Sequence, residues 1–206
     1  MAEATKDGAF LQALNAEFSM LQGARAATIS ESSSRSGLYM TTLSGAVVAL
    51  ALVAQASKFG ETFFIFALAI MPVVFFLGAA TYYRLLQSGV EDVIYARAIT
   101  DIRKFFGEID PSRASFFQAS GVNFEGLRGV GLWRLRWQQF LSAAATVAIV
   151  NGVVGGAFVA LVVAYFAHPG AFVSIVVGAI AAAILVTAFL VHQWRTWMRV
   201  AVALKT

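Results

Sequence analysis

The order of apolar and charged residues divides the chain into four long uncharged stretches joined by charged segments. No Asp, Glu, Lys, Arg or His occurs in residues 36–57, 62–83, 137–167 or 169–191. Each stretch holds at least 22 residues, and about 20 helical residues cross the roughly 30 Å hydrocarbon core of a bilayer. The pattern therefore predicts an all-α integral membrane protein with four transmembrane helices.

The lengths of the connections predict that these helices form two hairpins. Residues 58–61 (Lys-Phe-Gly-Glu) turn the chain after the first stretch, and residues 168–170 (His-Pro-Gly) turn it after the third. The connection in the middle of the chain, residues 84–136, is much longer. We therefore expect residues 37–83 and 137–192 to form the first and second transmembrane hairpins.

The N-terminal segment, residues 1–36, predicts an amphipathic helix followed by a linker. Phe10, Leu14, Phe18 and Leu21 recur at helical spacing within residues 8–30. Such a helix can lie on the membrane surface, pack on the central segment or pair with a copy of itself. The serine-rich run at residues 30–37 supplies capping residues and predicts a flexible break, so that the first span starts near Gly37.

The second span is expected to continue beyond the membrane. No helix breaker follows it before Gly107, and an apolar stripe persists as far as Phe105. One helix would thus leave the bilayer and run into the cytoplasm as part of a helical segment, residues 84–136. Residues 193–206 form a cytoplasmic tail in this interpretation.

The distribution of positive charge predicts the orientation. Fourteen of the fifteen Lys and Arg residues lie in residues 1–36, 84–136 and 193–206, and Lys58 is the exception. Because cytoplasmic loops are enriched in Lys and Arg, both termini are expected in the cytoplasm, with the hairpins in the inner (plasma) membrane. The net charge of +4 then reflects topology, and no nucleic-acid partner is expected.

Tryptophans agree with this orientation, because the ring is favoured at the membrane interface. All four lie where the third and fourth spans meet the predicted cytoplasmic surface: Trp133, Trp137, Trp194 and Trp197.

Small residues recur at every fourth position of the third span. The row comprises Ala144, Ala148, Gly152, Gly156, Ala160 and Ala164, and the fourth span has Ser174, Gly178 and Ala182 at the same spacing. Small side chains allow the backbone of a second helix to approach closely. Two interpretations remain open: packing inside one four-helix bundle, or an interface between subunits.

Two residues inside the spans are candidates for pore lining or gating. Asn151 is the only amide in the middle of a span, so it either bonds a neighbouring helix or lines a pore. Pro72 lies near the middle of the second span and predicts a kink, because proline removes a backbone hydrogen bond. The kink is either structurally neutral or a hinge.

Several classes of function have no support in the sequence. The chain has no cysteine, and its spans hold no ionisable side chain of the kind that proton relays and ion-coupled transporters use. His168 and His192 fall at opposite membrane surfaces, so they cannot share a metal ion. We expect no cofactor, no metal and no catalytic residues, although an enzyme acting on lipid stays open.

Phenylalanines concentrate in the central segment and predict an assembly surface. They would seal the cytoplasmic helices together or become buried between subunits. The residues are Phe105, Phe106, Phe116 and Phe117.

Residues 95–106 (Tyr-Ala-Arg-Ala-Ile-Thr-Asp-Ile-Arg-Lys-Phe-Phe), placed between two hairpins, resemble the corresponding segment of uncharacterised bacterial membrane proteins. In overall plan the chain also resembles the small multi-span effectors of prokaryotic antiviral defence. The resemblance implies a pore or a membrane-disrupting effector and assigns no functional residue. We therefore expect a self-associating membrane protein that forms a pore-like or membrane-perturbing assembly regulated from its cytoplasmic helices. The alternative is a membrane anchor or adaptor that recruits a soluble protein partner through residues 84–136.

Overall fold

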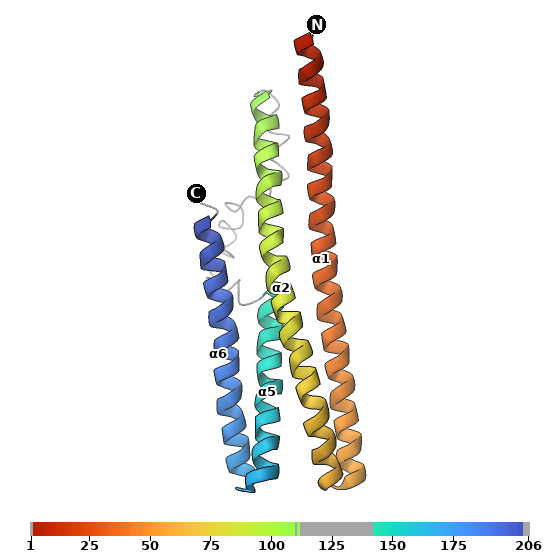
Figure 1. The fold of residues 1–206 in the computed structure, drawn as a ribbon, viewed down its shortest axis with the longest axis vertical. Helices are drawn as coiled ribbons and strands as arrows, with labels where there is room; N and C mark the ends of the chain where they lie inside the picture. The colour runs from red at the N-terminus through yellow and green to blue at the C-terminus, as the bar shows by residue number, and fades with distance from the viewer. Residues whose placement is uncertain (1, 110, 112–141, 204–206) are drawn as a thin grey trace. The chain divides into compact units, whose positions relative to one another are not determined.

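The protein folds into long helices, as the computed structural model shows for residues 2–109, 111 and 142–203. The helices are α1 (Ala2–Ser57), α2 (Glu61–Ile109), α5 (Ala143–Ala167) and α6 (Ala171–Ala203) (Figure 1). No strand occurs in these residues. Each of the four helices is long and apolar enough to cross a membrane, which confirms the all-helical prediction with four candidate spans.

The helices belong to two compact units, and α1 and α2 each contribute to both. Residues 2–31 of α1 and the part of α2 from Ser88 onward form the first unit, here called the helix pair. Residues 32–87 and 142–203 form the second, here called the four-helix unit. Within the four-helix unit, α1 and α2 make the first hairpin, and α5 and α6 make the second.

Helix α1 corrects one expectation, because it contains no break at residues 30–37. It is helical from Ala2 to Ser57 without interruption. Serine costs only a few tenths of a kcal/mol in a helix, so the run is a weak breaker. Glu31 and Arg35 also stand four positions apart, the spacing at which opposite charges support a helix.

Helix α2 runs without interruption from Glu61 to Ile109 and contains Pro72. The expectation that the second span continues as one helix is confirmed. The missing N–H of Pro72 removes one backbone hydrogen bond, but the helix persists for 37 residues beyond it. Gly89 lies within this helix and does not interrupt it.

The turn of the first hairpin follows from left-handed backbone at two residues. Lys58 and Phe59 have φ of 50° and 59°, a conformation that ends α1 because it cannot continue a right-handed helix. The amide of Gly60 donates to the carbonyl of Ser57 over 2.9 Å. The chain reverses within three residues.

In the second hairpin, helix α5 starts at Ala143, because Ser142 has extended backbone and its hydroxyl accepts a hydrogen bond from the amide of Ala145. Serine at this position satisfies one of the amides that have no partner in the first turn of a helix. The helix ends at Ala167, where His168 adopts the left-handed conformation. The predicted start of the hairpin at Trp137 lies outside the described residues.

The helix pair is antiparallel. Arg25 of α1 forms an ion pair with Asp92 of α2, with 2.7 Å between Nε and Oδ1. Nearer the N-terminus, the rings of Phe10 and Phe105 meet edge to face at 5.8 Å between centroids. Residues later in α1 therefore contact residues earlier in α2, as in any antiparallel pair of helices.

The α1 face of the helix pair follows a coiled-coil spacing. Its less exposed positions recur at intervals of four, three, four and three residues, the alternation typical of two helices packed along a seam. These positions are Leu14, Phe18, Leu21, Arg25 and Thr28, and Ala24 beside Arg25 is also partly buried.

The core of the four-helix unit lies where the first hairpin faces α5. Buried side chains come from α1, α2 and α5, and Phe189 and Trp197 of α6 pack against them. Near the two turns, which lie at the same end of this unit (Figure 1), the rings of Phe64 and Tyr165 are 5.3 Å apart. At the other end, the rings of Tyr82 and Phe189 are 4.8 Å apart.

Candidate functional site

A buried hydrogen bond connects the first hairpin to α5. The hydroxyl of Tyr39 donates to Oδ1 of Asn151 over 3.3 Å, and both side chains are 0 % exposed. Hydrogen bonds between helices in an apolar medium contribute about 0.6–2 kcal/mol. Of the two interpretations of Asn151, bonding to a neighbouring helix is the one that this geometry supports within a single chain.

Helix α2 reaches the same point through a glycine. A Cβ atom at Gly78 would overlap the amide of Asn151 and would lie 2.8 Å from the ring of Tyr39. Only a residue without a side chain allows α2 to come this close. Three helices thus meet at one layer, here called the Tyr39–Gly78–Asn151 layer.

The layer is incomplete as a hydrogen-bond network. The Nδ2 atom of Asn151 is buried and has no hydrogen-bond partner among the described residues. A buried donor without an acceptor costs about 1–3 kcal/mol. The packing of the first hairpin on α5 therefore includes one buried donor, Nδ2 of Asn151, that weakens it locally.

A second polar contact joins α2 to α6 at the end of the unit away from the turns. The hydroxyl of Tyr82 donates to the carbonyl of Phe189 over 2.7 Å and lies 3.2 Å from Nδ1 of His192. Nearby, Nε2 of Gln193 donates to the hydroxyl of Ser142 over 3.2 Å. These contacts fasten α6 to α2 and to the start of α5.

The row of small residues packs against α6 of the same chain. A Cβ atom at Gly156 would lie 2.5 Å from the carbonyl oxygen of Gly178 and 2.5 Å from Cβ of Ala182. A Cβ atom at Gly178 would lie 2.6 Å from Cβ of Ala160. The backbones of α5 and α6 are therefore nearly in contact at Gly156 and Gly178, and this place is here called the glycine contact. In this structure, the small residues of the row allow α5 and α6 of one hairpin to approach closely.

The rest of the row has mixed surroundings. Ala144 and Ala148 are buried in the core, and Ala164 is partly exposed. Gly152 approaches the side chain of Val186. Ser174 is buried, and its hydroxyl donates to the carbonyl of Gly170, the residue before α6, over 3.2 Å.

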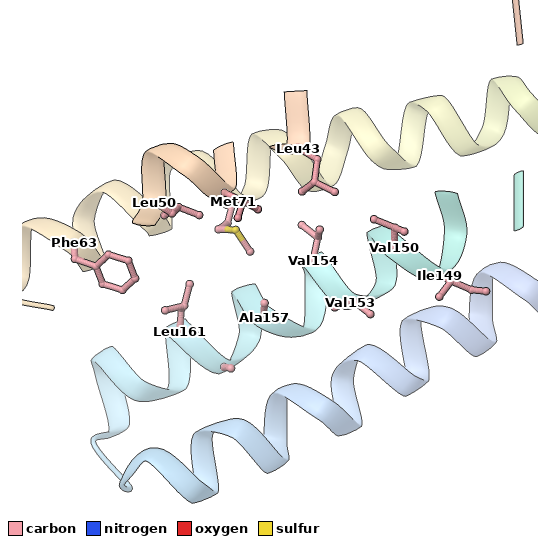
Figure 2. Close-up of a pocket in the computed structure, with 12 residues that line it drawn as sticks. Leu43, Leu50, Phe63, Met71, Ile149, Val150, Val153, Val154, Ala157 and Leu161 are labelled. Carbon is pink, nitrogen blue, oxygen red and sulfur yellow. The ribbon is translucent and has the colours of Figure 1, made fainter. Parts of the chain in front are cut away.

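An apolar groove lies beside the layer, between the first hairpin and α5. Its volume is about 660 Å³. Figure 2 shows Leu43 and Leu50 of α1 and Met71 of α2 facing it from one side, with Val154 and Leu161 of α5 on the other. Every residue that lines it is apolar. Pro72 does not line it, but directly follows Met71, which does.

The predicted assembly surface is described only in part. Phe105 is 38 % exposed and contacts Phe10, and Phe106 is partly buried beside it. Trp194 is 37 % exposed, whereas Trp197 packs against the core. The other residues predicted for these roles lie outside the described residues: Phe116, Phe117, Trp133 and Trp137.

Electrostatics outside the four-helix unit centre on Arg25. Its guanidinium donates two hydrogen bonds to Asp92, from Nε over 2.7 Å and from Nη2 over 3.4 Å. The hydrogen bond to this carboxylate raises the pKa of Arg25. The guanidinium of Arg103 also lies 5.7 Å from the ring centroid of Phe18, within range of a cation–π contact.

Sequence reasoning identified Asn151 but missed its partners. Tyr39 is a hydroxyl-bearing residue at the start of an uncharged stretch, and Gly78 is the one glycine of the second span. The sequence shows both residues, but it does not indicate that either of them would contact Asn151. No sequence pattern predicted the groove, because its existence depends on the distance between the packed helices.

The described residues hold no group of three or more His, Asp or Glu side chains that could bind a metal ion. Comparison of the chain with protein-family models, with curated proteins and with solved structures finds no match.

Proposed function

We propose that the protein is an integral membrane protein whose copies form a pore-like or membrane-perturbing assembly, controlled through the helix pair. In this proposal the four helices cross the inner (plasma) membrane and the helix pair lies in the cytoplasm. The uncharged stretches and the one-sided distribution of Lys and Arg support this placement.

The observation that carries the proposal is the continuity of α1 and α2. Each is a single helix that belongs to both the helix pair and the first hairpin. A continuous helix is stiff over this length, because every turn is hydrogen-bonded to the next. A partner or ligand that moves the helix pair therefore acts on Tyr39 of α1 and Gly78 of α2.

The contact between the first hairpin and α5 is the place where such a movement would have its effect. It combines a buried amide whose Nδ2 lacks a partner among the described residues with an apolar groove. The contact between α5 and α6 is much closer, because Gly156 and Gly178 bring the backbones together. We infer that the two hairpins separate from each other while the second hairpin stays intact.

A membrane adaptor without transport is the second candidate, and exposed apolar residues of the helix pair favour it. Met20 is 68 % exposed, and Ile109 is 53 % exposed. Side chains of this kind suit a surface that binds a soluble protein. The adaptor would use the same helix pair as the pore but would leave the hairpins closed.

Placement in the membrane is tested first by labelling. The chain has no cysteine, so single cysteines can be introduced without background. A membrane-impermeant maleimide added to intact cells should label Glu61→Cys and Ala171→Cys, at the turns. It should label Gly23→Cys, in the helix pair, only after the cells are opened. The reverse pattern would refute the proposed orientation.

Liposome flux then separates the two candidates. Purified protein reconstituted with trapped dye should release the dye and should elute from a sizing column as an oligomer. Tyr39→Phe, which removes the buried hydroxyl, should increase the release rate. Tyr83→Phe removes the hydroxyl of a side chain that is 53 % exposed and is the matched control. A monomer that releases no dye, with or without the substitution, would exclude the pore and leave the adaptor.

A further inference from the structure

The groove between the first hairpin and α5 has a size and a chemistry that suit a slender apolar ligand. Its volume of about 660 Å³ falls within the range of ligand sites, which is about 300–1,000 Å³. The lining consists of aliphatic side chains with one Met and one Phe, and contains no polar residue. Nothing in the lining could orient a polar ligand or hold a chain of water molecules.

A helix of a second copy is a poor fit for this groove. Five of the seven α5 residues that line the groove are Val, Ile or Leu, and their branched side chains keep the backbone of a second helix at a distance. Helices in membranes also associate through small residues, and Gly156 of α5 already packs against α6.

Polar residues do not favour a helix either. Asn151, which could bond to a neighbouring helix, faces Tyr39 inside the bundle. The groove therefore offers a second copy neither close backbone approach nor a hydrogen bond. A flexible hydrocarbon chain requires neither of these and can follow an irregular channel.

We propose that the groove binds an acyl chain of a membrane phospholipid, given the membrane placement proposed above. Phe63 lines the groove, and its ring contacts Phe59 in the turn at 5.4 Å between centroids. Lys58 precedes Phe59 and is the only Lys or Arg of the two connecting turns. A chain in the groove thus places its headgroup phosphate at the level of a positive charge.

Occupation of the groove would oppose the pairing of the two hairpins along its length. The acyl chain covers Leu50 and Val154 in place of direct contact between their helices. The bound acyl chain would therefore set the distance between the first hairpin and α5 along the groove. At the Tyr39–Gly78–Asn151 layer the two would stay in direct contact.

Photocrosslinking in vesicles tests the proposal. The protein is reconstituted in phosphatidylethanolamine and phosphatidylglycerol with a trace of phosphatidylcholine that carries a diazirine midway along one acyl chain. After irradiation, labelled residues are mapped by mass spectrometry. Labelling of residues 43–50 and 149–161 should exceed that of the exposed α6 positions Ile175 and Ile184 several-fold.

Filling the groove supplies the matched comparison. Ala157 lines the groove and is exposed, so Ala157→Phe should remove most of the excess labelling. Ala179 is exposed on α6 at a similar number of residues from the second turn, and Ala179→Phe should leave the labelling unchanged. Ala157→Leu is the milder substitution if the first variant elutes abnormally.

The outcomes separate the failure of this proposal from the failure of the membrane placement. Equal labelling of all four helices would overturn the groove site and leave the placement intact. Excess labelling that persists in both Ala157 variants would also overturn the site. A second copy seated in the groove would exclude the lipid probe, so labelling of the groove below that of Ile175 and Ile184 would overturn the lipid site and assign the groove to self-association. Protein recovered in soluble form without detergent, with no label on any helix, would refute the placement itself.

Discussion

The hydroxyl of Tyr39 donates a hydrogen bond to Oδ1 of Asn151, although 112 positions separate the two residues in the sequence. Both side chains are fully buried, and this bond ties α1 to α5 at the centre of the four-helix unit. The amide nitrogen of Asn151 has no partner among the described residues. The pair therefore combines a stabilising bond with an uncompensated donor.

Removing one half of this pair should cost more than removing both. Tyr39→Phe leaves both polar atoms of Asn151 without a partner and should lower the free energy of unfolding by about 1–3 kcal/mol. The double variant Tyr39→Phe/Asn151→Leu replaces both groups by apolar ones of similar size and should recover most of that loss. Thermal unfolding in detergent measures the difference. A double variant less stable than Tyr39→Phe would contradict the arrangement.

Gly78→Ala should destabilise the protein, because the added Cβ atom would collide with the side chains of Asn151 and Tyr39. Overfilling a packed site costs about 1–3 kcal/mol. Gly45→Ala is the control, since a Cβ atom there has no neighbour within 4 Å. The control should be neutral or slightly stabilising, because alanine favours a helix over glycine. Equal unfolding temperatures for the two variants would mean that α2 does not approach Asn151.

Substitutions in the glycine contact should disrupt the second hairpin, whatever the number of subunits. Gly156→Leu and Gly178→Leu place side chains against backbone atoms that cannot rotate away. Both variants should unfold at lower temperature and lose protein during purification. Ala179→Leu, at an exposed position of α6, should behave like the parent chain. Variants that fold normally and only dissociate into monomers would place the row between subunits instead.

The continuity of α1 predicts opposite effects of two substitutions in the serine-rich run. Gly37→Ala should raise the free energy of unfolding by about 0.5–1 kcal/mol, because glycine is a poor residue in the interior of a helix. Ser33→Pro should lower it by about 3 kcal/mol. In the flux assay, Ser33→Pro should also uncouple the helix pair from the hairpin. A linker in place of the helix would make both substitutions nearly neutral.

The ion pair between Arg25 and Asp92 should contribute little to stability and should be sensitive to salt. The two side chains are 42 % and 29 % exposed, and pairs of this kind contribute about 0.2–1 kcal/mol. Arg25→Asp should destabilise the helix pair, and the exchange Arg25→Asp/Asp92→Arg should restore it, as hydrogen exchange of residues 10–31 would report. High salt should reduce the difference.

The charge on Arg25 adds no pH dependence in the neutral range. Asp92 raises the pKa of Arg25, so its contribution is present below the ordinary pKa of arginine and is lost only as the pH rises through the raised value. Melting curves across the neutral range should therefore show no change from this group.

The four long apolar helices could be predicted, because each contains an uncharged stretch of at least 22 residues, and the cost of placing a charge in hydrocarbon explains why such stretches are typical of candidate spans. The extension of α2 beyond its span was also predictable, since no strong breaker interrupts it. The prediction of a break at residues 30–37 was wrong because this run, like the interior of α2, contains no strong helix breaker. Local preferences of serine amount to tenths of a kcal/mol, and the packing of residues on both sides outweighs them.

The contacts between helices were only partly predictable. A row of small residues indicates that some backbone approaches α5, but the row has the same appearance whether that backbone belongs to α6 or to another copy. Asn151 likewise indicated that a polar partner exists. Its identity as Tyr39 depends on the rotation of α1 about its own axis, which no local pattern records.

The near contact between Gly156 and Gly178 has a consequence for biogenesis. The two halves of the second hairpin fit each other without any contribution from the first, and a turn of three residues joins them. Under the proposed membrane placement, we expect the insertion machinery to release α5 and α6 into the lipid as one preassembled pair. Docking on the first hairpin is then a separate, later and more easily reversed event.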